Sequence, residues 1–158
     1  AMCFWNFLGA GIFGFAINPP IALYYIQGLN TTAVHGHAAL FGVYGILGIG
    51  LMMFVLRGLY PDREWNDKLI GWAFWLTNIG LLVMVTISLL PIGIMQSVAS
   101  IKEGYWYARS AEFMQTDLME TLRWLRVPGD ILLAVGELLI VIFIIGLKTG
   151  WSLKGKRE

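Results

Sequence analysis

The residues of this sequence best suited to chemistry are two histidines, His35 and His37, which are separated by Gly36. The chain has no other histidine. Successive residues of an α-helix are rotated by about 100°, so side chains two positions apart point to nearly opposite sides of the helix. A helix that binds one metal ion needs its ligands on one face, at positions i and i+4. The spacing therefore predicts two separate centres, one on each side of a helix.

The surroundings of the histidines indicate what they bind. The pair lies in an uncharged segment, since no Asp, Glu, Lys or Arg occurs before Arg57. An ionisable side chain in a membrane segment is a candidate functional group, and neutral imidazole is a common ligand of haem iron. The alternative is that each imidazole is a hydrogen-bonded packing residue, which is the usual role of a buried histidine in a soluble protein. We expect His35 and His37 to be axial ligands of two haem groups.

The composition is that of a membrane protein, because 58% of the 158 residues are hydrophobic and 13% are charged. About 20 apolar residues cross a bilayer as a helix. The uncharged segments therefore predict an all-α, polytopic membrane helix bundle in a single domain, residues 1–158. Its four expected transmembrane helices cover residues 4–26, 33–56, 69–98 and 128–148. The third is one long helix, kinked near Pro91, because its uncharged segment is too short for two crossings.

Two features interrupt or begin the expected helices. The run Asn18–Pro20 must kink or break the first helix, because proline lacks the N–H group that a helix needs. A tolerated kink is the commoner outcome, and a broken helix that lines a transport site is the alternative. In the turn that follows, Asn30, Thr31 or Thr32 is the candidate N-cap of the second helix.

Glycines are frequent in the expected helix 33–56, which carries the histidines. They are Gly36, Gly42, Gly45, Gly48 and Gly50. Glycine leaves the surface of a helix bare, which suits a flat ring pressed against the backbone. Close packing of a neighbouring helix is the alternative.

The distribution of Lys and Arg predicts the topology. The loop 57–68 has three of them and the segment from Lys148 to the C-terminus has four, whereas the turn 27–32 has none. We therefore expect both termini and the loop 57–68 in the cytoplasm, with the histidines near the outer membrane surface. The charged segment 102–126 is then an outer interfacial segment. Its aromatic belt consists of Tyr105, Trp106, Tyr107 and Trp124.

The composition also excludes several functions. The net charge is +1 and the basic residues are scattered, so a nucleic-acid partner is not expected. Cys3 is the single cysteine, which excludes an internal disulfide and a cysteine metal cage. The sequence starts in apolar residues without the basic region and cleavage site of a signal peptide. We expect the chain to be the later part of a longer polypeptide.

Three runs of residues resemble a known family. They are Asn18–Gly45, Gly104–Ser110 and Arg126–Asp130. They resemble the catalytic subunit of bacterial nitric oxide reductase, of the quinol-dependent single-chain type, in the haem-copper oxidase superfamily. The resemblance covers essentially the whole chain, as the C-terminal portion of that subunit. It implies an enzyme of the bacterial inner (plasma) membrane that takes electrons from quinol or cytochrome c and reduces nitric oxide to nitrous oxide.

The resemblance implies a role for each candidate site residue. His35 corresponds to the proximal ligand of high-spin haem b3, and His37 corresponds to one axial ligand of low-spin haem b. Arg123 lies near the position where related oxidases hold haem propionates with arginine; the alternative for it is a solvated interfacial arginine. The oxidases usually have an aromatic residue between or just after the histidines, where this chain has Gly36 and Ala38. That difference favours the nitric oxide reductase branch.

The resemblance also implies partners for this chain. Low-spin haem b needs a second axial histidine, and the non-haem iron of the family needs three histidines and a glutamate. This chain has no third histidine, so the remaining N-terminal helices of the same subunit must supply these ligands. We expect the 158 residues alone to insert into membrane lipid but to be inactive. Glu137, within the fourth helix, is either a proton relay or a hydrogen-bond partner of another helix.

Two other functions stay open at this point. One is a fragment of subunit I of an oxygen-reducing haem-copper oxidase. The other is a haem-free membrane transporter or scaffold, which the Asn18–Pro20 run and the glycine-rich helices suggest.

Overall fold

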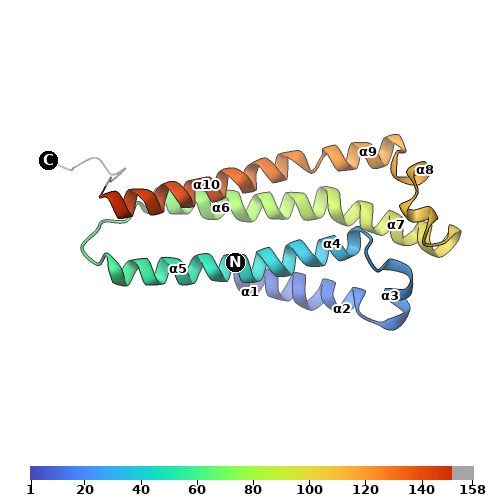
Figure 1. Ribbon diagram of the computed structural model, residues 1–158, viewed down its shortest axis with the longest axis horizontal. Helices are drawn as coiled ribbons and strands as arrows, with labels where there is room; N and C mark the ends of the chain where they lie inside the picture. The colour runs from blue at the N-terminus through green and yellow to red at the C-terminus, as the bar shows by residue number, and fades with distance from the viewer. Residues whose placement is uncertain (151–158) are drawn as a thin grey trace.

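The structure is a bundle of helices. The computed structural model describes residues 1–150, and this part of the chain contains helices, turns and bends but no strand. Three helices are long and apolar enough to cross a membrane, namely Asn30–Leu59, Asp67–Glu103 and Asp117–Thr149. The bent pair Met2–Ile17 and Pro20–Ile26 adds a fourth crossing if it counts as one span. Figure 1 shows these helices in one elongated bundle, which confirms the expected all-α architecture.

Each long helix consists of shorter elements in succession. The first helix contains α1 (Met2–Trp5), η1 (Asn6–Phe13) and α2 (Gly14–Ile17), and α3 (Pro20–Ile26) follows it. The second contains α4 (Asn30–Gly36), η2 (His37–Gly45) and α5 (Ile46–Leu59), and the third contains α6 (Asp67–Val83), η3 (Met84–Leu89) and α7 (Leu90–Glu103). The last elements of the described residues are η4 (Tyr107–Arg109), α8 (Ala111–Met114), α9 (Asp117–Trp124) and α10 (Val127–Thr149). Segments η1, η2 and η3 are π-helical, whereas η4 is a 3₁₀ turn.

The run Asn18–Pro20 breaks the first span. Pro19 has φ −56° and ψ 141°, which is extended backbone, and Pro20 begins α3. Neither proline has an N–H group with which to continue the helix, and α3 is turned by 89° from the helix before it. This is a sharper change than the kink that we expected within residues 4–26.

The third helix passes through Pro91 without ending. The π-helical segment η3 comes just before it, and Pro91 lies in the first turn of α7. A widened turn relieves the contact between a proline ring and the carbonyl group of the preceding turn. One continuous helix, Asp67–Glu103, therefore occupies the segment in which we expected the span 69–98.

The expected interfacial segment, residues 102–126, contains the short elements η4, α8 and α9. They lie at the same end of the bundle as α3 (Figure 1). Trp106 and Trp124 are 79% and 68% exposed, which suits an aromatic belt. Tyr105 and Tyr107 are half-buried instead, so these two rings also take part in packing at this end of the bundle.

Helices α6 and α10 touch through their backbones, because glycines face the contact from both sides. A Cβ atom added at Gly80 would lie 2.5 Å from Leu133 N, and one added at Gly136 would lie 2.7 Å from Thr77 N. Small residues allow membrane helices to approach closely and gain packing energy. The close α6–α10 pair is therefore the framework beside which the histidine helix lies.

The histidine helix packs against the first helix in the same way. A Cβ atom added at Gly9 would lie 2.6 Å from Ala38 C, and one added at Gly42 would lie 2.7 Å from Trp5 Cγ. Close helix packing, which was one alternative for the glycines of this helix, is thus found at Gly42. Four other glycines of the helix would meet nothing within 4 Å: Gly36, Gly48, Gly50 and Gly58.

The first residues of the chain lie near the middle of the long axis of the bundle. Trp5 is 1% exposed, and its Nε1 donates a hydrogen bond of 2.9 Å to Asn78 Oδ1. Gly42, which Trp5 contacts, is near the middle of the helix Asn30–Leu59, and Figure 1 shows the N-terminus beside the middle of that helix. Our expectation that both termini are in the cytoplasm stays a prediction. The basic tail Lys154–Arg157, on which that expectation also rested, is outside the described residues.

We predict opposite effects of one substitution at two glycines of α6. Gly80→Ala should lower the free energy of unfolding by about 1–3 kcal/mol, because the new methyl group would force α6 and α10 apart. Gly71→Ala is the matched control, since nothing lies within 4 Å of its added Cβ and alanine favours a helix by roughly 0.5–1 kcal/mol. Reversible unfolding of the complete protein in mixed detergents measures both. Equal stability of the two variants would contradict the backbone contact.

Candidate functional site

His35 lies in the last turn of α4 and faces the first helix. Its Nδ1 is 2.8 Å from the carbonyl oxygen of Gly9. A carbonyl oxygen accepts and cannot donate, so Nδ1 carries the ring hydrogen and Nε2 keeps its lone pair. The ring approaches the first helix at Gly14, where an added Cβ would lie 3.1 Å from His35 Cε1. The backbone of the first helix thus orients this imidazole.

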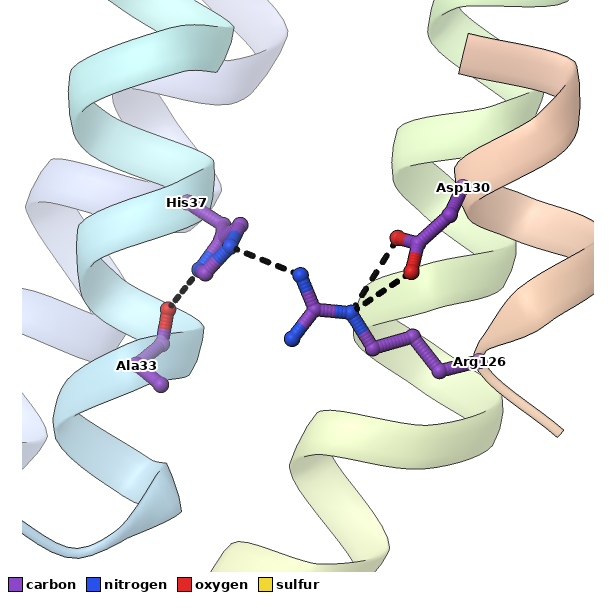
Figure 2. Close-up of polar contacts among 4 residues, drawn as sticks. All are labelled: Ala33, His37, Arg126 and Asp130. Carbon is purple, nitrogen blue, oxygen red and sulfur yellow. Dashed lines mark hydrogen bonds and ion pairs between the residues drawn. The ribbon is translucent and has the colours of Figure 1, made fainter. Parts of the chain in front are cut away.

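His37 is the first residue of η2, and its ring bonds to the helix that carries it. Nδ1 is 2.8 Å from the carbonyl oxygen of Ala33, and Nε2 is 3.4 Å from Nη2 of Arg126. Figure 2 shows both contacts. Because the carbonyl accepts and the guanidinium donates, Nδ1 carries the hydrogen and Nε2 is the base. Both histidines therefore have the same tautomer, with a lone pair on Nε2.

The two imidazoles contact different helices. His35 bonds to η1, whereas His37 reaches the turn before α10. This is the opposite-side arrangement that a spacing of two residues requires. Residues 1–150 contain no group of three or more His, Cys, Asp and Glu side chains that could hold a metal ion. The part of the chain that the structure describes thus offers two single nitrogen ligands, which suits axial ligation of two macrocycles better than a tetrahedral site.

A hollow of about 380 Å³ lies beside His35. Small and apolar residues form most of its wall. Its lining residues are Ala10, Gly11, Gly14, Phe15, Ile17, Asn18 and His35. A hollow of small residues with one nitrogen base among its lining residues has room for the edge of a flat cofactor. Any side chain larger than hydrogen at Gly14 would push against the imidazole.

Arg126 is the functional candidate that the sequence analysis missed. It lies on the turn between α9 and α10, and its Nε is 3.1 Å from both carboxylate oxygens of Asp130. Figure 2 shows this pair beside His37. The side chains are 36% and 43% exposed, so the ion pair orients the guanidinium more than it stabilises the fold. The i, i+4 spacing of Arg126 and Asp130 is the signal that could have found it.

Arg123, the arginine singled out from the sequence, lies elsewhere. It is exposed, and its side chain has no hydrogen bond or ion pair to any residue of 1–150. It belongs to the last turn of α9, whereas Arg126 follows the end of that helix. Arg126, and not Arg123, is the arginine whose side chain reaches His37.

Glu137 pairs with a neighbouring helix. Thr77 Oγ1 donates a hydrogen bond of 3.0 Å to Glu137 Oε1, and Thr77 is 3% exposed. The bond joins α6 to α10 next to Gly136, where the two backbones touch. Hydrogen bonding to another helix, one of the two alternatives for Glu137, is thus found. A half-buried acid with a hydroxyl donor avoids the cost of an unsatisfied polar group in the apolar layer.

We predict that Thr77 and Glu137 are energetically coupled. In a double-mutant cycle of Thr77→Val and Glu137→Leu, the coupling should be about 0.6–1.7 kcal/mol, the range measured for hydrogen bonds between membrane helices. Thr86→Val is the matched control, because Thr86 Oγ1 bonds to Leu82 O within its own helix. Unfolding of the complete protein in mixed detergents measures the cycle. Equal coupling of Glu137 with Thr86 would contradict the specific bond.

Comparison with known proteins gives the family. The profile of the family "Cytochrome C and Quinol oxidase polypeptide I" matches residues 1–132. The chain is also 30% identical over 142 residues to the B subunit of nitric oxide reductase from Stutzerimonas stutzeri, a match that covers 82% of this chain and 28% of that protein. The chain therefore spans little more than a quarter of the length of this relative. With the helical bundle and the family match together, the chain belongs to the cytochrome c and quinol oxidase polypeptide I family, within the haem-copper oxidase superfamily.

Proposed function

We propose that this chain supplies one axial ligand to each of two haems in the catalytic subunit of a nitric oxide reductase, with His35 on haem b3 and His37 on haem b. The observation that carries the proposal is a pair of imidazoles on opposite sides of one helix, each with Nδ1 bonded to a backbone carbonyl group. Such a bond fixes the ring and raises the basicity of Nε2 as a ligand. The complete subunit would reduce two molecules of nitric oxide, with two electrons and two protons, to nitrous oxide and water.

The surroundings of both histidines fit a flat apolar ring. Small residues line the hollow beside His35, and Gly36 leaves the helix bare between the two ligands. Haem iron, when bound, supplies the redox centre and the position for a diatomic substrate. The residues of this chain orient the two imidazoles and surround them with apolar surface, which tunes the redox potential.

Arg126 is the residue best suited to hold a haem propionate beside His37. Its bond to His37 Nε2 is 3.4 Å long, beyond the usual range of about 2.7–3.2 Å, so a stronger ligand can replace it. Guanidinium groups bind carboxylates through paired hydrogen bonds. Asp130 engages Nε and leaves the two outer nitrogens for a propionate. We assign to Arg126 the role that the sequence suggested for Arg123.

Other parts of the subunit must complete the site. The two histidines of the chain leave haem b without its second axial ligand and the non-haem iron without its three histidines and glutamate. The N-terminal helices of the same subunit are the proposed source of these residues. Exposed apolar side chains such as Leu51 and Phe54 of α5 offer surface to those helices or to lipid. We place the subunit in the bacterial inner membrane, with quinol or cytochrome c as electron donor and the loop 57–68 in the cytoplasm.

Two other functions have an observation in their favour. The matched family includes oxidases, which reduce oxygen at a centre that contains copper. Metal analysis of the complete protein separates the two chemistries, since iron at the second metal position supports the reductase and copper supports the oxidase. A haem-free transporter is favoured by the 89° break before α3. A Soret band in the purified complete protein would exclude it.

We predict two different defects for the two histidines. His37→Ala should remove the low-spin haem signal and block electron entry, while high-spin haem remains. His35→Ala should retain a reducible low-spin haem and lose nitric oxide turnover. Each change removes a strong-field nitrogen from one iron, and this chain has no third histidine to replace it. Optical and EPR spectra of both variants in the complete protein measure this. Loss of the same signal from both variants would contradict the assignment to two centres.

We predict that Arg126, unlike Arg123, raises the reduction potential of the low-spin haem. A nearby positive charge favours the reduced iron, so Arg126→Ala should lower the midpoint potential. The expected size is on the order of 60 mV, which corresponds to about 1.4 kcal/mol for one electron. Arg123→Ala is the matched control and should leave the potential unchanged. Redox titration of the haem spectra measures both, and equal shifts would contradict the role of Arg126.

A further inference from the structure

We propose that Gln96 is a positioning residue for both haem ligands, because it fixes the start of the helix that carries them. The inference rests on the proposed function. Gln96 lies in α7 and is 5% exposed. Its Oε1 accepts a hydrogen bond of 2.9 Å from Asn30 N, and its Nε2 donates one of 3.1 Å to Ala108 O. One buried side chain therefore connects the third helix, the histidine helix and the outer segment.

Gln96 provides the cap that the histidine helix lacks. The first N–H groups of a helix have no partner within that helix. The N-cap residue of α4 is Leu29, and no side chain of its own turn caps the helix. The sequence suggested Asn30, Thr31 or Thr32 as N-cap, but α4 already begins at Asn30. Gln96 Oε1 takes the place of the cap, so a residue of another helix determines where α4 begins.

Gly93 sets the distance between the two helices at the same point. A Cβ atom added at Gly93 would lie 2.6 Å from Thr31 N and 3.0 Å from Thr31 Cγ2. The start of α4 therefore rests directly on the backbone of α7, one turn before Gln96. The hydrogen bond to Gln96 fixes the position of the histidine helix along the bundle axis. The contact with Gly93 fixes its distance from α7.

Helix α7 and the segment that follows it also bind the turn before α4. Ser100 Oγ donates a hydrogen bond of 2.6 Å to Tyr25 O, and Tyr105 OH donates one of 2.5 Å to Gln27 O. Arg109 Nη1 donates a further bond of 2.6 Å to the Tyr105 hydroxyl. Helix α7 and the segment after it thus bind backbone atoms on both sides of the turn. The loop from the broken first span cannot shift along the bundle without breaking these bonds.

A displacement of the start of α4 at Asn30 would also displace His35 and His37. His35 and His37 follow it by five and seven residues, which is about 7–11 Å along a rigid helix. The far end of the same helix, α5, is largely exposed, so it adds little restraint within the described residues. Metal ligands need positions held to within about 0.5 Å. A shift of one end of α4 would therefore tilt both imidazoles relative to their irons.

The test compares variants of the complete protein. Gln96→Met keeps the length of the side chain and removes both hydrogen bonds, whereas Gln96→Glu keeps an acceptor for Asn30 N. Ser97→Ala is the matched control, because Ser97 Oγ bonds to Gly93 O within its own helix. Hydrogen exchange of the amides of residues 30–32 and EPR of the low-spin haem are measured on each variant.

The expected result is at least about tenfold faster amide exchange in Gln96→Met, together with changed g values of the low-spin haem. Gln96→Glu should restore both towards the wild type, and Ser97→Ala should change neither. Faster exchange with unchanged g values would overturn the positioning role and leave Gln96 as a cap alone. Wild-type exchange in Gln96→Met would overturn the cap itself. Absence of low-spin haem from the wild-type protein would instead refute the proposed function, and the exchange data would still test the cap.

Discussion

The apolar layer of a membrane requires that backbone hydrogen bonds be completed within the protein, and this requirement determines how the histidine helix is held. Two prolines end the regular hydrogen bonding of the first span, and the backbone that follows has to find partners elsewhere. It finds them on α7, where Gln96 accepts from Asn30 N and Ser100 donates to Tyr25 O. The break in the first span and the position of the histidines are therefore parts of one arrangement.

The glycines have two different roles in the bundle. At Gly80, Gly136 and Gly9 they let backbones touch, which joins α6 to α10 and the first helix to the second. At Gly36 and Gly48 no other atom of residues 1–150 comes close enough to meet an added Cβ. Packing explains the first set and does not explain the second. Gly36 lies between the two histidines in the sequence, so the bare helix surface there agrees with the proposed haem sites.

The polar groups near the histidines form a short chain of partners. Asp130 orients Arg126, Arg126 reaches His37, and His37 bonds to Ala33 O. Only His37 has the Arg126–Asp130 ion pair beside it, so the surroundings of the two imidazoles differ electrostatically. That difference provides a physical basis for unequal potentials of the two proposed haems.

The sequence by itself determined the fold class and the placement of the two histidines on opposite sides of a helix. Long uncharged segments leave few alternatives to membrane helices, and the rotation per residue fixes where His35 and His37 can point. It also suggested two alternatives for Glu137, one of which is the bond with Thr77 that the structure contains.

Tertiary structure alone decided which groups meet across the bundle. The break at Asn18–Pro20 could have been a kink, because its angle depends on what the chain packs against. Arg126, and not Arg123, lies beside His37, which is 89 residues away in the sequence. The cap of α4 came from Gln96, which is 66 residues away in the sequence. Contacts between distant residues depend on how whole helices are placed, and local sequence patterns contain no information on that placement.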